Sequence, residues 1–238
     1  MKWAIKMLWG FLLAVFLIGV PKIGGWIASL LDQSKIDPDG AFMWISIHHI
    51  VQMLVVFIVM IVLTKIFKID FKLGLGHKEK GIKLTKWFIF GFTLYTVIAF
   101  GITIILGAFQ SFPYPLNARN ITGYLGFQLL LSGPSEELIF RAFSMTMFMV
   151  LIKSNKHFKH ISSANLYAAV IFMLAHVGFS LLPLSISYSL PQLVLSFVLG
   201  LFYGYAYEKT ESVVYPMIWH SFSNVMMVGL TVVLSYIL

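Results

Sequence analysis

Long apolar runs alternate with short polar breaks along the whole chain. Several of these runs exceed the roughly 18 residues that a helix needs to cross the hydrocarbon layer of a bilayer. The predicted spans cover about residues 3–31, 42–67, 87–106, 121–152, 161–182, 190–207 and 213–238. The pattern therefore predicts an all-α fold, a polytopic transmembrane bundle of about seven spans. Because no linker is long enough to separate two domains, we expect one membrane-embedded domain over residues 1–238.

Two of these spans contain residues that disturb a regular helix. In the first span, Pro21-Lys22 and Gly24-Gly25 predict a kink or a break. The fourth run, 121–152, is too long for one straight crossing and contains Gly133-Pro134. Proline removes a backbone donor and favours either a kink or a fresh helix start. The pattern leaves open whether residues 121–152 form one bent helix or two.

Composition and charge support a membrane protein and give it an orientation. The chain is 59% hydrophobic and 11% charged, whereas soluble domains carry about 25% charged residues. Its net charge of +8 comes mainly from lysines in short loops, seven within residues 65–86 and three within 153–160. The positive-inside rule then predicts a cytoplasmic N-terminus and an uncleaved first span, and explains the charge without a nucleic-acid partner. The absence of cysteine excludes a disulfide framework and a thiol nucleophile.

Three charged residues lie deep within the fourth predicted span. The chain has nine acidic residues, and only Glu136 and Glu137 fall far from a loop; Arg141 follows on the same run. A charged side chain at the centre of a membrane helix costs on the order of 3 kcal/mol on insertion scales. Such residues are normally retained for function, so this stretch is the candidate site.

Helical spacing divides the roles of these three residues. Glu137 and Arg141 are four apart, share a helix face and are expected to form an ion pair. Glu136 is turned about 100° away and has no cation at its own i+4 position. An unpaired carboxylate in apolar surroundings suits a general base, so we expect Glu136 to act as base with Glu137 and Arg141 in support. The alternative is a neutralised cluster that only holds neighbouring helices together.

Two histidines and an amide lie within later predicted spans. His176 falls in the middle of the fifth span, while His220 and Asn224 are four apart in the seventh and face the same way. Imidazoles and a carboxylate can hold zinc, or can polarise a water without a metal. Asn224 and a histidine can also donate to a developing oxyanion.

The depths of these residues do not agree. Counting about 1.5 Å per residue, Glu136 and His176 lie ~24 Å and ~22 Å from the cytoplasmic ends of their spans, but His220 only ~12 Å. Near the outer end of the second span, His48, His49 and Gln52 are interpreted as polar residues that the membrane interface tolerates.

The ordered motifs resemble one known family of membrane proteases. They read Glu136-Glu137-x-x-x-Arg141, Phe172-x-x-x-His176 and His220-x-x-x-Asn224. In order and spacing they resemble the CAAX prenyl protease and bacteriocin-processing (CPBP, or Abi) family of intramembrane proteases. The motif core would occupy about residues 121–238.

The resemblance implies hydrolysis of a peptide bond inside the bilayer. By the pattern of the family, Glu136 would activate water and His176 would help to hold it. His220 and Asn224 would stabilise the oxyanion, with Glu137 and Arg141 supporting the site. A divalent metal such as zinc, held by a glutamate with His176 and His220, and a metal-independent mechanism both stay open.

Two functional hypotheses follow from the sequence. The first is an intramembrane endopeptidase acting on a peptide or a membrane protein, with bacteriocin or pheromone processing or self-immunity as its role, since bacterial members of the family have such roles. Nothing in the sequence indicates the eukaryotic-type host that a prenylated CAAX substrate requires. The second is a non-catalytic membrane immunity scaffold, or a proton-coupled transporter that uses Glu136, His176 and His220 as a relay.

Overall fold

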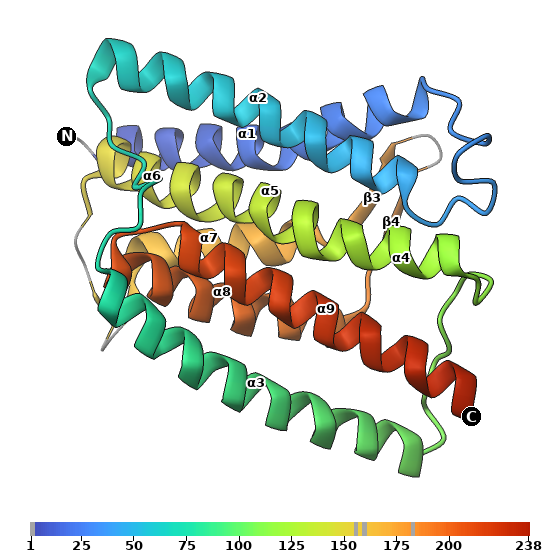
Figure 1. Cartoon of the computed structure of the whole chain (residues 1–238). Coiled ribbons are helices and arrows are strands. Elements are labelled where there is room, and N and C mark those ends of the chain that lie inside the picture. The colour runs from blue at the N-terminus through green and yellow to red at the C-terminus, as the bar shows by residue number, and fades with distance from the viewer. Residues whose placement is uncertain (1–2, 155–156, 159–160, 182–183) are drawn as a thin grey trace.

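The structure is a computed structural model that describes residues 3–154, 157–158, 161–181 and 184–238. It is a bundle of helices with two short hairpins (Figure 1). Among the described residues, five helices are long and apolar enough to cross a membrane. They are α1 (Trp3–Ser29), α2 (Met43–Phe67), α3 (Lys78–Ile105), α8 (Leu190–Thr210) and α9 (Val214–Ile237). The predicted all-α bundle is confirmed.

Residues 118–152 form one continuous helix built of five consecutive segments (Figure 1). The segments are α4 (Ala118–Phe127), the π-helical turn η1 (Gln128–Ser132), α5 (Gly133–Glu137), the π-helical turn η2 (Leu138–Phe143) and α6 (Ser144–Ile152). The residues at all four junctions have right-handed helical dihedrals. The wider turn η1 ends at Ser132, immediately before Gly133-Pro134, and accommodates the missing donor and the bulk of the ring without ending the helix. The open question of one helix or two is thus answered in favour of one.

Of the kink or break expected in the first span, a break does not occur. Helix α1 continues through Pro21 to Ser29. The glycines that suggested a break serve helix packing instead: a Cβ on Gly24 would lie 2.6 Å from the carbonyl oxygen of His48 on α2. Small residues at such a contact allow two helix backbones to approach closely.

The fifth predicted span was wrong in length. Helix α7 covers only Ser163–Ala175, and the strands β3 (Gly178–Leu181) and β4 (Leu184–Ser187) follow it as an antiparallel hairpin. Small or polar residues alternate with apolar ones in β3, a period of two that is typical of strands and that a count of apolar residues does not detect. A smaller hairpin pairs β1 (His157–Phe158) with β2 (Ile161–Ser162) ahead of α7.

The C-terminal helices pack closely, with an apolar pocket on the outside. Glycine at position 204 of α8 faces α7, where an added Cβ would overlap the side-chain amide of Asn165.

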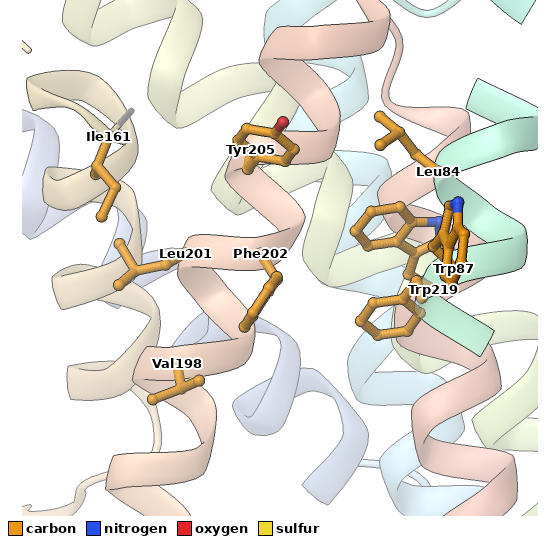
Figure 2. A pocket seen from close by; sticks show the side chains of 9 residues that line it. Leu84, Trp87, Ile161, Val198, Leu201, Phe202, Tyr205 and Trp219 are labelled. Carbon is orange, nitrogen blue, oxygen red and sulfur yellow. The ribbon is translucent and has the colours of Figure 1, made fainter. Parts of the chain in front are cut away.

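A pocket of about 440 Å³ lies between α3 and α8 (Figure 2). Trp219 of α9 lines it, stacks on Phe88 at 4.3 Å between ring centroids, and donates its Nε1–H to Thr85 Oγ1 at 2.7 Å. The aromatic packing thereby joins α3 to α9.

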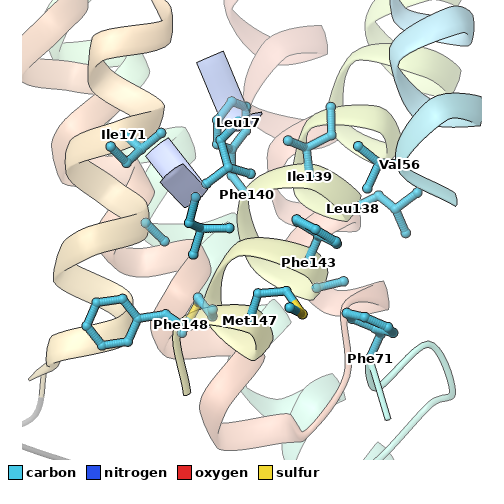
Figure 3. Packing of buried hydrophobic residues seen from close by; sticks show 14 of the residues in the cluster. Leu17, Val56, Phe71, Leu138, Ile139, Phe140, Phe143, Met147, Phe148 and Ile171 are labelled. Atoms are coloured by element: carbon cyan, nitrogen blue, oxygen red, sulfur yellow. The ribbon is translucent and has the colours of Figure 1, made fainter. Parts of the chain in front are cut away.

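The main apolar core lies beside the π-helical turn η2. Most of its buried side chains come from α1, α2, η2, α6 and α7 (Figure 3), and they include Leu17, Val56, Ile139, Phe143, Phe148 and Ile171. All six side chains of η2 are buried, including the guanidinium of Arg141. The charged part of the helix over 118–152 is therefore held between apolar helices on several sides.

Candidate active site

Glu137, Arg141 and His220 form a buried polar cluster. Arg141 Nε lies 3.0 Å from Glu137 Oε2, and the imidazole Nδ1 of His220 lies 2.8 Å from Glu137 Oε1. The side chains of Glu137 and Arg141 are both 0% exposed. The Arg141 guanidinium also lies 4.6 Å from the ring centre of Phe172 and 5.5 Å from that of Tyr203. The ion pair expected from the i,i+4 spacing is confirmed, and it has a histidine as a further partner.

Glu136 points to a different set of neighbours and is the more accessible carboxylate. Its Oε1 lies 3.7 Å from His49 Nε2, and its Oε2 lies 3.8 Å from His220 Nε2. The side chain is 17% exposed, compared with 0% for Glu137. Glu136 therefore lies between imidazoles of α2 and α9 and keeps part of its side chain exposed.

His176 is not in the middle of a span, as the sequence suggested, but at the C-terminal cap of the short helix α7. Its Nδ1 lies 2.8 Å from the carbonyl oxygen of Phe172. A carbonyl only accepts hydrogen bonds, so Nδ1 carries the hydrogen and Nε2 is free to accept one. His176 interacts electrostatically with Glu136. The structure thus brings a third imidazole into the neighbourhood of this carboxylate.

Asn224 faces the same helix as His220, as its i+4 position predicts. Its Nδ2 donates to Ser132 Oγ at 2.9 Å. The close approach of the two helices depends on Gly133, where an added Cβ would lie 2.6 Å from Ser221 Oγ. The absence of a side chain at position 133 therefore lets α9 present His220 and Asn224 to the polar face of the helix over 118–152.

The mismatch in depth is explained by where α9 begins. The Thr146 hydroxyl of α6 lies 2.8 Å from the Tyr207 hydroxyl near the end of α8, so the α8–α9 turn is level with the middle of α6. The segment before α3 crosses this turn: the Val213 amide donates to Lys72 O at 3.0 Å and the His77 amide to Thr210 O at 2.7 Å. Helix α6 extends beyond the start of α9, and His220 reaches Glu137 although it lies only six residues into its helix.

His49 and Gln52 belong to the polar cluster around Glu136, although their positions in the sequence did not predict this. Both are buried on α2, where His49 Nδ1 lies 2.6 Å from Ser135 Oγ and 2.9 Å from Gln52 Nε2. A signal for them exists in the sequence, because Ser46, His49 and Gln52 recur every three residues and continue the buried face of Val56. The interpretation of His49 and Gln52 as interface residues was wrong.

The donor groups do not form a ready metal site. Within the part of the chain that the structure describes, no group of three His, Cys, Asp or Glu side chains is arranged to hold a metal ion.

One comparison with known proteins gives a match. Residues 118–226 match the family model for the Rce1-like type II CAAX prenyl endopeptidases. The matched segment includes Glu136, Glu137, Arg141, His176, His220 and Asn224. No curated protein and no solved structure matches the chain.

Proposed function

The chain carries, in residues 118–226, a domain of the Rce1-like type II CAAX prenyl endopeptidase family, and on this premise we propose that it is an intramembrane endopeptidase with Glu136 as general base. The observation that carries the proposal is the contrast between two adjacent carboxylates. Glu137 is fully buried and bound to Arg141 and His220, whereas Glu136 is partly accessible and flanked by imidazoles. A carboxylate in that setting suits proton transfer.

In the proposed reaction, a water beside Glu136 attacks the carbonyl carbon of the scissile peptide bond. Glu136 takes the proton that the water loses as the new C–O bond forms, and later gives it to the amine as the C–N bond breaks. His176, with Nε2 free to accept, holds the second hydrogen of the water. Atoms and charges balance with water as the only co-reactant.

The oxyanion of the tetrahedral intermediate would be stabilised from α9. The Asn224 amide carries two hydrogens, and only one is used on Ser132. His220 is held by Glu137 through Nδ1, which supports a positive charge on the ring when Nε2 is protonated. These two groups would supply the donors for the developing negative charge, and losing one such donor costs about 10²–10³-fold in rate in other enzymes.

The substrate is proposed to be a peptide or a membrane protein reached within the bilayer. Processing of a bacteriocin or pheromone precursor, or a self-immunity role, is the physiological setting we propose. We further propose that residues 1–238 act as one membrane-embedded domain, because α1 and α2 pack on the same helix that carries Glu136.

The test compares the wild type with Glu136→Gln in detergent, using unmodified and prenylated fluorogenic peptides with and without a strong chelator. Removal of a general base should lower the cleavage rate by about 10²–10⁴-fold. Glu79→Gln, in the first turn of α3 and outside the site, is the control and should cleave at the wild-type rate. Equal cleavage by the wild type and Glu136→Gln would refute the proposal, and loss of activity in the chelator would require a metal. A scaffold would keep its function in Glu136→Gln.

We propose that the N-terminus faces the cytoplasm. The lysine-rich ends of α2 and α6 lie at the same end of the bundle as the start of α1 (Figure 1). Because the chain has no native cysteine, single cysteines can be labelled with an impermeant maleimide. In intact cells, Ser111→Cys should react and Lys80→Cys should react only after permeabilisation; the reverse pattern would invert the orientation.

A further inference from the structure

A second polar cluster lies beside Glu136, at the carboxylate oxygen that does not face α9. It consists of His49 and Gln52 on α2 and Ser135 on α5, all of them buried and outside the six residues of the motifs. Gln52 Nε2 lies 2.9 Å from His49 Nδ1 and 3.2 Å from Ser135 Oγ. Ser135 Oγ in turn lies 2.6 Å from His49 Nδ1. Two side chains, one from α2 and one from α5, therefore converge on one ring nitrogen of His49.

These contacts determine which nitrogen of His49 carries the hydrogen. An amide nitrogen only donates, so with Gln52 in this orientation His49 Nδ1 must accept. The oxygen of the Ser135 hydroxyl accepts from Gln52, and its one hydrogen has two acceptors in reach: His49 Nδ1 at 2.6 Å and the carbonyl oxygen of Ser132 at 3.3 Å. The shorter contact favours donation to His49. A neutral imidazole with an accepting Nδ1 has its hydrogen on Nε2, and Nε2 is the atom that faces Glu136 Oε1 at 3.7 Å.

His220 has the opposite arrangement on the other side of the carboxylate. Its Nδ1–H donates to Glu137, so the Nε2 that faces Glu136 Oε2 at 3.8 Å has a lone pair when the ring is neutral. Glu136 thus has a donor beside Oε1 and an acceptor beside Oε2. Two acceptors cannot bond to each other, so this side of the carboxylate needs a donor from elsewhere, and a water can supply it.

We propose that His49 is a positioning residue: its Nε2–H faces Glu136 Oε1 across 3.7 Å and closes to a hydrogen bond when substrate is bound, so that Oε2 is the oxygen that takes the proton from water. This inference rests on the proposed peptidase function. Gln52 and Ser135 act through His49 by keeping its hydrogen on Nε2. The other ionisable groups that act on Glu136 are His176 from α7, His220 from α9 and Arg141 from its own helix, with His48 beside His49 on α2. Among the described imidazoles whose hydrogen bonds determine the tautomer, His49 is the one that has Nε2–H toward Glu136 when the ring is neutral.

The kinetic test uses two amides that imitate different parts of the ring. In His49→Gln, the side-chain nitrogen can reach the place of Nε2 and keep the donor; in His49→Asn, the amide reaches only the place of Nδ1. We expect His49→Asn to lower kcat by an amount on the order of 10²-fold with little change in KM. The acidic limb of its pH–rate profile should move to higher pH, because the charged form of Glu136 loses a donor. His49→Gln should restore most of the wild-type kcat and most of the wild-type pH–rate profile.

Ser46→Ala, on the same buried face of α2, is the matched control and should behave as the wild type. A wild-type kcat and pH profile in His49→Asn, or an equal defect in both amide variants, would overturn the proposal. Comparable thermal unfolding of the two variants would exclude a difference in folding as the cause.

A second measurement does not depend on activity. In the full-length protein labelled with ¹⁵N-histidine, the His49 resonances, assigned by their loss in His49→Gln, should show a hydrogen on Nε2. Gln52→Leu should shift them toward the other tautomer. A hydrogen on Nδ1 would overturn the proposal even in an active enzyme. The expected tautomer in a protein that cleaves no peptide would instead refute the proposed function and leave the positioning contact intact.

Discussion

The buried Glu137–Arg141 pair allows the sharpest test of how this fold is held together. Arg141→Met keeps most of the side-chain volume but leaves Glu137 without its cation at a position with no solvent exposure. At 3.0 Å and an effective dielectric constant of 20, Coulomb attraction between the two charges is about 5 kcal/mol. Glu137 retains the contact with His220, and breaking one partner of a buried pair typically costs ~3–5 kcal/mol. We therefore expect a loss of about 3 kcal/mol in the free energy of unfolding.

The assay is reversible unfolding in mixed micelles by titration with SDS, followed by tryptophan fluorescence. Lys72→Met is the matched control, because the Lys72–Glu211 pair has a similar separation of 3.3 Å but lies at the surface, and it should cost less than ~1 kcal/mol. Replacing both buried charges, in Glu137→Leu/Arg141→Met, removes the unpaired carboxylate and should recover part of the loss. A change within ~1 kcal/mol for Arg141→Met would refute the reasoning, as would a double variant less stable than the single one.

Two further predictions concern the loops at opposite ends of the bundle. Gly76 has φ +51°, and a Cβ added there would lie 2.6 Å from Glu211 O. A left-handed backbone conformation costs a residue with a side chain ~1–2 kcal/mol. Because the clash adds to this cost, Gly76→Ala should lower the free energy of unfolding by more than that amount. Gly40→Ala, with φ +65° and open space around its Cβ, should lose only the backbone part; equal losses in the SDS titration would contradict this. Burial raises the pKa of Asp37, but hydrogen bonds from the amides of residues 41–43 outweigh it and hold the pKa below its usual value. A depressed carboxyl pKa adds stability above the unfolded value of about 3.9, and this stability is lost as pH falls through the folded pKa. The stability difference between wild type and Asp37→Asn should therefore shrink below about pH 4, and a constant difference would exclude this role.

The sequence alone determined the features that depend on local periodicity. Apolar length predicted the all-α bundle and most helix positions, because a helix in a bilayer must satisfy its own backbone hydrogen bonds. The spacing of four between Glu137 and Arg141, and between His220 and Asn224, predicted which side chains share a face. Both placements are seen in the structure.

Only the tertiary structure decided how these faces meet. The start of α9 level with the middle of α6, the short helix α7 that ends at His176, and the burial of His49 against Ser135 all depend on contacts between segments far apart in the chain. An apolar run has nearly the same composition whether it faces lipid or another helix, so hydropathy does not reveal its neighbours. Helical periodicity is a property of a few consecutive residues, whereas depth, register and partner choice come from the packing of the whole bundle.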